Sequence, residues 1–197
     1  MQVTKYTHSC VRLERDGQAL VIDPGVWSEP RALRDANAVL LTHEHADHAD
    51  VLRLAGLGVP VFAPAGASLP GLEPLALAAG EAIDVAGFTV RAIGAAHTTI
   101  YNGLPDCDHL GYLIDGLYHP GDSVHPPSAE VDVLLVPVHG SWLKTHEAID
   151  FVRSINPRVA IGIHEGQLNE RGLESANGWL AEVNAQYRYL APGESLL

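Results

Sequence analysis

Cysteine, basic residues and long apolar runs are all scarce in this chain of 197 residues. Its two cysteines, Cys10 and Cys107, are too few for a disulfide framework and do not form a C-x-x-C pair. No apolar run approaches the roughly 18 residues needed to span a bilayer, and the opening MQVTKYTHSC lacks the apolar region of a signal peptide. We therefore expect a soluble, cytoplasmic protein with no membrane span.

The shortage of basic residues bears on the expected partners. The chain has 12 Lys and Arg against 24 Asp and Glu, which gives a formal net charge of −12, and it contains no basic cluster. Such a charge repels polyanions, so nucleic acid is not favoured and a small-molecule substrate is the expected partner. Most of the acidic residues are expected on the solvated surface.

Apolar residues, in contrast, are abundant. They make up 47% of the chain, which is ample for one buried core, and we predict a single domain over residues 1–197. The first half is mostly β, because short apolar or alternating runs are separated by turn residues such as Asp16-Gly17. The predicted strands and hairpins of this half lie at residues 2–6, 10–15, 19–24, 38–42, 59–64, 81–96 and 110–122. A helical pattern between 38–42 and 59–64 indicates a buried βαβ unit.

The second half alternates strands with helices. Strands are predicted at 131–138 and 158–163, and helices at 145–156 and 169–185. Thr145 is the expected N-cap of the first helix, and Pro157 is expected to end it. Hairpins and βα units in both halves favour an α/β fold in which two mixed sheets pack together with helices outside.

Residues 43–48 read His-Glu-His-Ala-Asp-His, which is either a solvated polar turn or a cluster of ligands. The positions of other polar residues favour ligands, because His97, Asp122 and His164 each follow an apolar run directly. Strands in a layered α/β fold deliver such residues to one rim of the sheets. The spacing therefore predicts a metal site at that rim, because unrelated polar residues would not all follow apolar runs directly.

These ligands suffice for two metal ions. Alternate residues of an extended segment can approach one cation, whereas the residues that start the following helix point elsewhere. The predicted ligands are His43, His45 and His97 for one metal, Asp47, His48 and His164 for the other, and Asp122 as a bridge. A tetrahedral zinc takes about four ligands and leaves one position to water in a catalytic site.

The same motifs resemble the metallo-β-lactamase superfamily. The resemblance rests on H-x-H-x-D-H, GAAHT, YHPGDS, IGIHEG and VIDPG, and it runs from THSCVRLE near the start to about residue 165. The compact length and YTHSCVRLE are similar to a branch of small metal-dependent hydrolases that includes ascorbate-phosphate lactonase and N-acyl-phosphatidylethanolamine phospholipase D. The resemblance implies a four-layer αββα sandwich with two divalent metal ions, normally Zn²⁺ and sometimes manganese or iron.

Two departures from known relatives narrow the expected activity. Common di-zinc β-lactamases have Cys where Asp122 stands, and flavodiiron proteins have a carboxylate where His45 stands, so neither activity is favoured. The resemblance instead implies that a hydroxide bridged by two metals attacks an ester, lactone or phosphodiester of a small molecule. Asp47, Asp122 and His8 are the predicted catalytic residues, with Asp47, water or His8 as the acid that protonates the leaving group.

Two other functions stay open at this point. One is an iron-dependent redox enzyme on the same fold, which metal analysis and an optical spectrum would identify. The other is a non-catalytic metal-binding protein, which would be inert toward a panel of esters, lactones and phosphodiesters. A homo-oligomer is also left open, because related small hydrolases often self-associate.

Several polar residues lie outside the predicted ligand set. Asp23 is expected to orient the metal loop without touching substrate. His139 follows a buried strand and could line the pocket, although it has no place in the ligand set, while Trp142 is expected to pack. Surface or local hydrogen-bonding positions are expected for His109, His119, His125 and His146.

Overall fold

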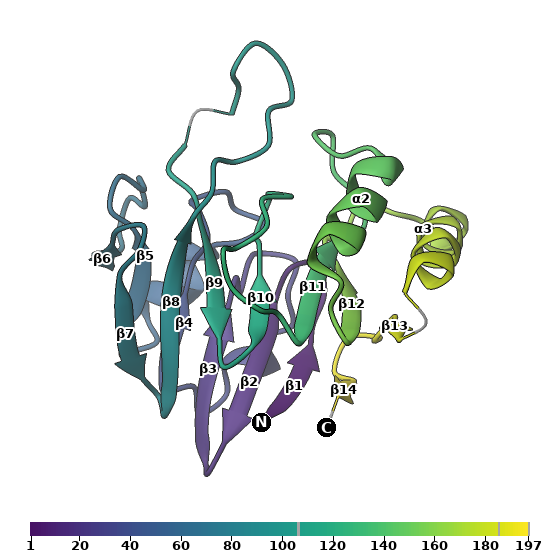
Figure 1. Cartoon of the computed structure of the whole chain (residues 1–197). Helices are drawn as coiled ribbons and strands as arrows, with labels where there is room; N and C mark the ends of the chain where they lie inside the picture. The colour runs from purple at the N-terminus through teal and green to yellow at the C-terminus, as the bar shows by residue number, and fades with distance from the viewer. Residues whose placement is uncertain (106, 185, 197) are drawn as a thin grey trace.

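Two β-sheets pack face to face in the computed structural model, which describes residues 1–105, 107–184 and 186–196 (Figure 1). Within these residues the first sheet has the order β14-β1-β2-β3-β4-β5-β6, and the second has the order β13-β12-β11-β10-β9-β8-β7. The strands of the first sheet are β1 (Gln2–Lys5), β2 (Val11–Arg15), β3 (Gln18–Ile22), β4 (Ala38–Leu40), β5 (Val61–Pro64), β6 (Leu75–Leu77) and β14 (Ser195–Leu196). Those of the second are β7 (Ala82–Val85), β8 (Phe88–Gly94), β9 (Leu110–Ile114), β10 (Leu117–His119), β11 (Val133–Pro137), β12 (Val159–Ile163) and β13 (Tyr187–Arg188).

Strand directions decide where the loops of the two sheets meet. In the first sheet β1, β2 and β3 are antiparallel neighbours and β3 to β6 run parallel, so β1 and β4 point the same way. In the second sheet β8, β9 and β10 are antiparallel neighbours and β10 to β12 run parallel, so β8, β10 and β12 share one direction. The loops that follow these strands therefore all lie at the same end of their sheet.

The main core lies between the sheets. Leu13 and Leu40 of the first sheet and Ile114, Leu135 and Ile161 of the second belong to it, and each is 0% exposed. Complete burial of one such side chain stabilises the fold by about 1.5–3 kcal/mol. The alternating or continuous apolar pattern of these strands is therefore what holds the two sheets together.

Helices cover the outer faces of both sheets. On the second sheet, α2 (Thr145–Ile155) and α3 (Glu170–Val183) lie side by side, and Phe151 and Leu180 pack with Leu134 of β11 (Figure 1). On the first sheet, the short α1 (Val51–Ala55) and the 3-10 helix η1 (Pro30–Leu33) bury Leu54 and Leu33. The predicted four-layer αββα sandwich is confirmed. No helix in the described part of the chain is long and apolar enough to cross a membrane.

The structure corrects the predicted ends of the helices. Thr145 is the first residue of α2 and Lys144 is its N-cap, so the predicted cap is wrong by one residue. The backbone N–H of Lys144 donates to the Glu147 carboxylate at 2.7 Å, which satisfies a free donor at the helix start. The second predicted helix ends at Val183, and residue 185 lies outside the described residues.

Candidate metal centre

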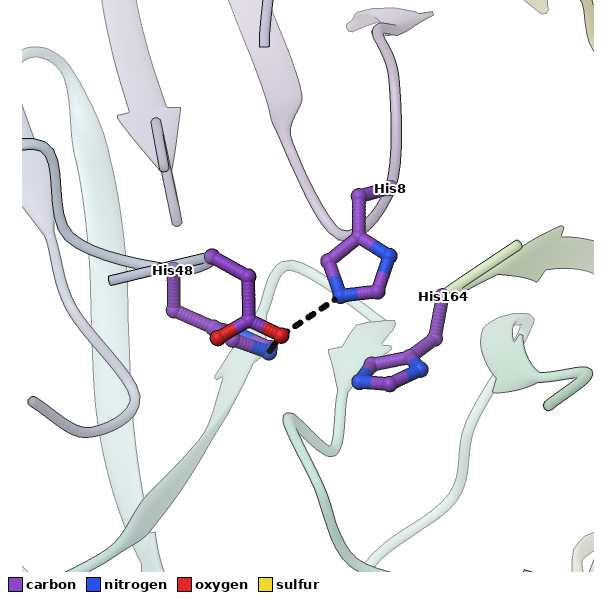
Figure 2. Close-up of side chains that lie close together, drawn as sticks. His8, His48 and His164 are labelled. Carbon is purple, nitrogen blue, oxygen red and sulfur yellow. Dashed lines mark hydrogen bonds and ion pairs between the residues drawn. The ribbon is translucent and has the colours of Figure 1, made fainter. Parts of the chain in front are cut away.

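The side chains predicted as ligands come together where the loops of the two sheets meet. The loop after β4 carries residues 43–48, and the loops after β8, β10 and β12 carry His97, Asp122 and His164. His8 adds a ring from the turn between β1 and β2, and it points toward His48 and His164 (Figure 2). Its ring centroid lies 5.4 Å from that of His48 and 3.9 Å from that of His164. Both sheets therefore contribute to one cluster.

One group of the cluster contains His43, His45, His97 and Asp122. Each offers a ligand atom, and these atoms all lie within 4.8 Å of one another. His43 Nε2 is 2.9 Å from His45 Nδ1, and His97 Nε2 is 3.4 Å from Asp122 Oδ2. These are the three histidines that the sequence assigned to one metal, together with the predicted bridge.

The other group contains His8, Asp47, His48 and His164, again with ligand atoms within 4.8 Å of one another. Asp47 Oδ2 is 3.1 Å from His8 Nε2 and 4.0 Å from His48 Nε2. The sequence assigned three of these residues to a second metal and predicted His8 as a catalytic residue outside the ligand set. The structure places His8 within the group itself.

Asp122 lies between the two groups. Its Oδ1 is 3.0 Å from His48 Nε2, and its Oδ2 is 3.1 Å from His164 Nε2. The same Oδ2 also faces the first group, at 3.4 Å from His97 Nε2 and 4.0 Å from His43 Nε2. Because its two oxygens face imidazoles of both groups, Asp122 occupies the position that a bridging carboxylate needs.

Buried hydrogen bonds assign hydrogens to two of the histidines. Asp23 is 0% exposed and accepts the backbone N–H and the hydroxyl of Thr42, both at 2.7 Å. It also accepts Nδ1–H of His48 at 2.8 Å. Because the Thr42 hydroxyl hydrogen is used, its oxygen accepts Nδ1–H of His43 at 3.0 Å. Both rings then present Nε2 to the cluster, which is how outer hydrogen bonds orient metal-binding imidazoles.

The same reasoning applies to His97 and His8. His97 Nδ1–H donates to the carbonyl oxygen of Thr98 at 2.8 Å, so its Nε2 also faces the cluster. His8 differs, because its Nδ1 accepts the backbone N–H of Gly166 at 3.1 Å and its hydrogen must be on Nε2. That hydrogen points at Asp47 Oδ2. His8 is therefore a hydrogen-bond donor to a candidate ligand in this arrangement.

Neighbouring charges shift pKa values inside the cluster. Burial alone would raise the pKa of Asp122, but His48 and His164 hold it well below its usual range. Burial would lower the pKa of His48, but Asp122 and Asp23 on either side hold it well above its usual value. Burial and the adjacent His48 lower the pKa of His43. Without a metal, the cluster thus combines ionised carboxylates with a neutral His43 and a protonated His48, and His48 would release its proton when a metal binds.

Three contacts hold Asp122 and its loop in place. The indole N–H of Trp142 donates to Asp122 Oδ2 at 3.0 Å, and the backbone N–H of Asp122 donates to His109 Nε2 at 3.0 Å. His109 in turn donates Nδ1–H to the carbonyl oxygen of Ala95 at 2.9 Å. Nearby, His119 donates Nε2–H to the carbonyl oxygen of Ser9 at 2.8 Å. These buried side chains fix the loop from both sheets.

The residues present fit a metal centre. Buried polar atoms normally have hydrogen-bond partners, yet His48 Nε2, His97 Nε2 and Asp122 Oδ1 have none that meets hydrogen-bond geometry among the described residues. All three belong to the cluster. Imidazole nitrogens and carboxylate oxygens that converge in this way are the donor set of zinc, iron and manganese sites.

A small depression of about 110 Å³ opens onto the cluster. His45, Asp47, His97, Asp122 and His164 form its polar floor. The remaining lining residues are Ile100, Gly140, Ser141, Trp142 and Gln167. Candidate ligands are therefore accessible from solvent, as a catalytic site requires.

The positions of the other polar residues agree with the sequence in part. Trp142 contacts Asp122 rather than only packing, whereas the half-buried His139 is absent from the described lining of the depression. His109 and His119 are buried and hydrogen-bonded, while His125 and His146 are exposed. Asp23 lies behind the ligands as expected. The ring N–H of Trp and the two nitrogens of His are signals for such contacts, but the sequence does not give their direction.

Comparison with known proteins adds to this geometry. Residues 2–164 match the family model described as a beta-lactamase superfamily domain. The chain belongs to the beta-lactamase superfamily. Within the superfamily it is 33% identical to protein Rv0786c of Mycobacterium tuberculosis over 99% of this chain and 98% of that one. It is 32% identical to UPF0173 protein PYRAB01190 of Pyrococcus abyssi, covering 93% of this chain and 90% of that one, which places it in the UPF0173 family.

Other relatives carry a functional name. The UPF0173 metal-dependent hydrolase MK1542 of Methanopyrus kandleri is 28% identical over 99% of both chains. Among solved structures, the metallo hydrolase Igni18 of Ignicoccus hospitalis has a TM-score of 0.71 and 21% identity, covering 99% of this chain and 97% of that chain. The metallo-beta-lactamase fold protein YhfI of Bacillus subtilis has a TM-score of 0.75 and 14% identity, covering 99% and 98%. The predicted superfamily and its small hydrolase branch are confirmed.

Proposed function

We propose that the protein is a hydrolase with two divalent metal ions, most simply Zn²⁺, that acts on a small molecule in the cytoplasm. The position of Asp122 between two groups of ligands supports this proposal most directly. Relatives named metal-dependent hydrolases support the reaction class. The first metal would be held by His43, His45 and His97, the second by Asp47, His48 and His164, with Asp122 shared by both.

Metals bound there supply a nucleophile from water at neutral pH and stabilise negative charge that develops on the substrate. Residues around the candidate ligands hold them in position. Asp23 fixes the ring of His48, and Trp142 fixes the carboxylate of Asp122, so these ligand atoms need no rearrangement. The depression admits one polar group of a substrate to this floor.

His8 and Asp47 form a pair that can hold a proton beside the site. The hydrogen on His8 Nε2 points at Asp47 Oδ2, 3.1 Å away. Burial lowers the pKa of His8 to about 4, although its bond to Asp47 opposes that shift. Burial would raise the pKa of Asp47, but His8 and His48 lower it to about 2. These shifts leave His8 neutral and Asp47 ionised near neutral pH, so we assign to the pair the role of accepting the proton that the attacking water releases and passing it to the leaving group.

The substitution Asp122→Ala tests the shared carboxylate. It removes the group between both sets of ligands, so hydrolysis of an ester, lactone and phosphodiester panel should be lost and fewer than two metals should bind per chain. Asp132→Ala is the matched control, because that carboxylate is exposed and pairs with Arg158. Metal content and activity are measured on the same samples. Full activity or two bound metals in Asp122→Ala would contradict the proposal.

Metal analysis of the wild-type protein also addresses the two alternative functions. The ligand set contains imidazoles and carboxylates, which suit zinc and iron alike. Iron in protein grown without added metal, with its optical spectrum, would favour redox chemistry. Bound metal without activity on the whole panel would favour a binding protein.

A further inference from the structure

Exposed apolar side chains gather on two loops beside the metal centre. Among the described residues, ten large hydrophobic side chains are exposed, and five of them lie in the segments 25–28 and 98–105. These five are Val26, Trp27, Ile100, Tyr101 and Leu104, with exposed fractions of 47%, 42%, 52%, 70% and 58%. We call them the apolar rim. Scattered single hydrophobic residues are ordinary on a surface, but a group around a polar site indicates a binding function.

The first segment of the rim is attached to the metal cluster. The backbone N–H of Val26 donates to the carbonyl oxygen of Ala46, inside the ligand loop, at 2.9 Å. The ring of Trp27 lies edge-on to that of His8 with centroids 4.8 Å apart. A Cβ atom at Gly166 would be only 3.0 Å from Trp27 Cε3, so the missing side chain at Gly166 makes room for the indole. Trp27 thus borders the group that contains His8.

The second segment borders the group that contains His97. The N–H of Thr98 donates to the carbonyl oxygen of Asp122 at 2.9 Å, which attaches the segment to a candidate ligand. The chain then turns back on itself, with Ile100 N–H donating to the carbonyl oxygen of Leu104 at 2.7 Å. Ile100 lines the depression directly. In Figure 1 the long loop between β8 and β9 that contains this segment rises above the edges of both sheets.

Positive side chains are missing from the same place. The described residues that line the depression include two carboxylates, Asp47 and Asp122, but neither Lys nor Arg. Lys5 lies behind the cluster, but it is 0% exposed and its Nζ donates to Glu165 and to the carbonyl oxygen of Tyr6. Sites that recognise phosphate or carboxylate groups normally use Arg or Lys for the purpose. With a net charge of −12 on the chain, only the metal ions themselves would attract an anionic group to this surface.

We propose that the substrates are uncharged acyl compounds, esters or lactones, whose alkyl or aryl group lies on the apolar rim while the acyl carbon enters the depression. This inference rests on the proposed function and narrows it, because it disfavours phosphodiesters. In the reaction a water oxygen bonds to the acyl carbon and the acyl C–O bond breaks. The proton released from water passes to the leaving alkoxide, so no redox partner is required. A depression of about 110 Å³ leaves the larger apolar group outside, on the rim.

Binding of alkyl hydroxamic acids to the zinc-loaded protein tests the inference without turnover. Acetohydroxamic and octanohydroxamic acid have the same metal-binding head, and the longer one has six more methylene groups. Each fully buried methylene contributes about 0.8 kcal/mol, or about fourfold in affinity, so partial burial on the rim should tighten binding at least tenfold. Calorimetry gives both dissociation constants, and metal content is measured after each titration.

Two variants test whether the tighter binding of octanohydroxamic acid depends on the apolar rim. In the double variant Trp27→Ala and Ile100→Ser, the ratio of the two dissociation constants should fall below about threefold. Trp179→Ala is the matched control, since Trp179 is 58% exposed on α3 and should leave the ratio unchanged. The wild-type ratio is informative even if the double variant does not fold, which circular dichroism would reveal.

Each outcome has a distinct meaning. If octanohydroxamic acid binds no more tightly than acetohydroxamic acid, or if the gain survives in the folded double variant, the rim is not the binding surface and the inference is wrong. If neither compound binds, the proposed metal centre itself fails. Faster hydrolysis of bis(p-nitrophenyl) phosphate than of p-nitrophenyl octanoate would overturn the assignment to uncharged acyl compounds.

Discussion

Replacement of Asp23 by Asn tests whether a residue that is not a candidate ligand controls metal binding. Asp23 accepts three hydrogen bonds, two from Thr42 at 2.7 Å and one from His48 Nδ1 at 2.8 Å. Asn has the same shape but places an NH₂ group where one oxygen lies. That group can donate to His48 Nδ1, which moves the ring hydrogen to Nε2, the atom 3.0 Å from Asp122 Oδ1. A protonated Nε2 has no lone pair for a metal.

The expected effects follow from these contacts. Loss of an outer hydrogen bond of this kind lowers metal affinity by about 10–100-fold. Hydrogen bonds to a charged group contribute about 1.5–3 kcal/mol and neutral ones about 0.5–1.5, so three bonds weaken by about 1 kcal/mol each. The lower cost of burying a neutral amide offsets part of this loss, leaving a net destabilisation of about 1–2 kcal/mol. The melting temperature should fall by roughly 2–8 °C.

Competition with a chromophoric chelator measures metal affinity, and scanning calorimetry of the metal-free protein measures stability. Asp132→Asn is the control, because its carboxylate is exposed and bonds to Arg158 at 2.7 Å. It should bind metal as the wild type does. If Asp23→Asn also bound metal with wild-type affinity and stoichiometry, the assigned ring hydrogens would be wrong.

Two further predictions concern Trp142 and buried tyrosines. Trp142→Phe removes the donor to Asp122 Oδ2 but keeps an aromatic ring, so metal affinity should fall about tenfold, as expected when a hydrogen bond to a charged group is lost. Chelator competition measures this, and unchanged affinity would show that the indole only packs. Separately, burial raises the pKa of Tyr112, Tyr118 and Tyr187 above the ordinary 10.0 in the folded protein. The unfolded chain loses these protons first, so the free energy of unfolding should fall as pH rises above about 10, by up to about 1.4 kcal/mol per pH unit for each tyrosine. Urea titrations across this range would refute the argument if stability stayed constant.

Elements with strong local patterns were predictable from the sequence. The continuous apolar runs at 131–138 and 158–163 became β11 and β12, and the predicted hairpins at 81–96 and 110–122 formed the antiparallel pairs β7–β8 and β9–β10. The position of the candidate ligands at strand ends was predictable for the same reason, since it depends only on strand order and direction.

Features set by tertiary contacts were not predictable. Strands β6, β13 and β14 have only two or three residues and no periodic pattern, so their pairing partners define them. The direction of the Trp142 indole depends on the loop between β11 and α2, and the burial of His109 depends on the loop from β8. In each case the residue type permitted the contact but its direction came from distant parts of the chain.

The candidate ligands belong to two different sheets, and this has a mechanical consequence. Residues 43–48 are anchored in the first sheet, whereas His97, Asp122 and His164 are anchored in the second. A cation bound by residues of both sheets would therefore cross-link the two sheets at the end where the loops meet. Binding of the cation then stabilises the folded state, and the gain grows with the logarithm of the free cation concentration divided by its dissociation constant. The side chains that bind the cation for the reaction would also hold the two sheets together. Removal of the cation would therefore weaken the contact between the sheets at the end where substrate enters.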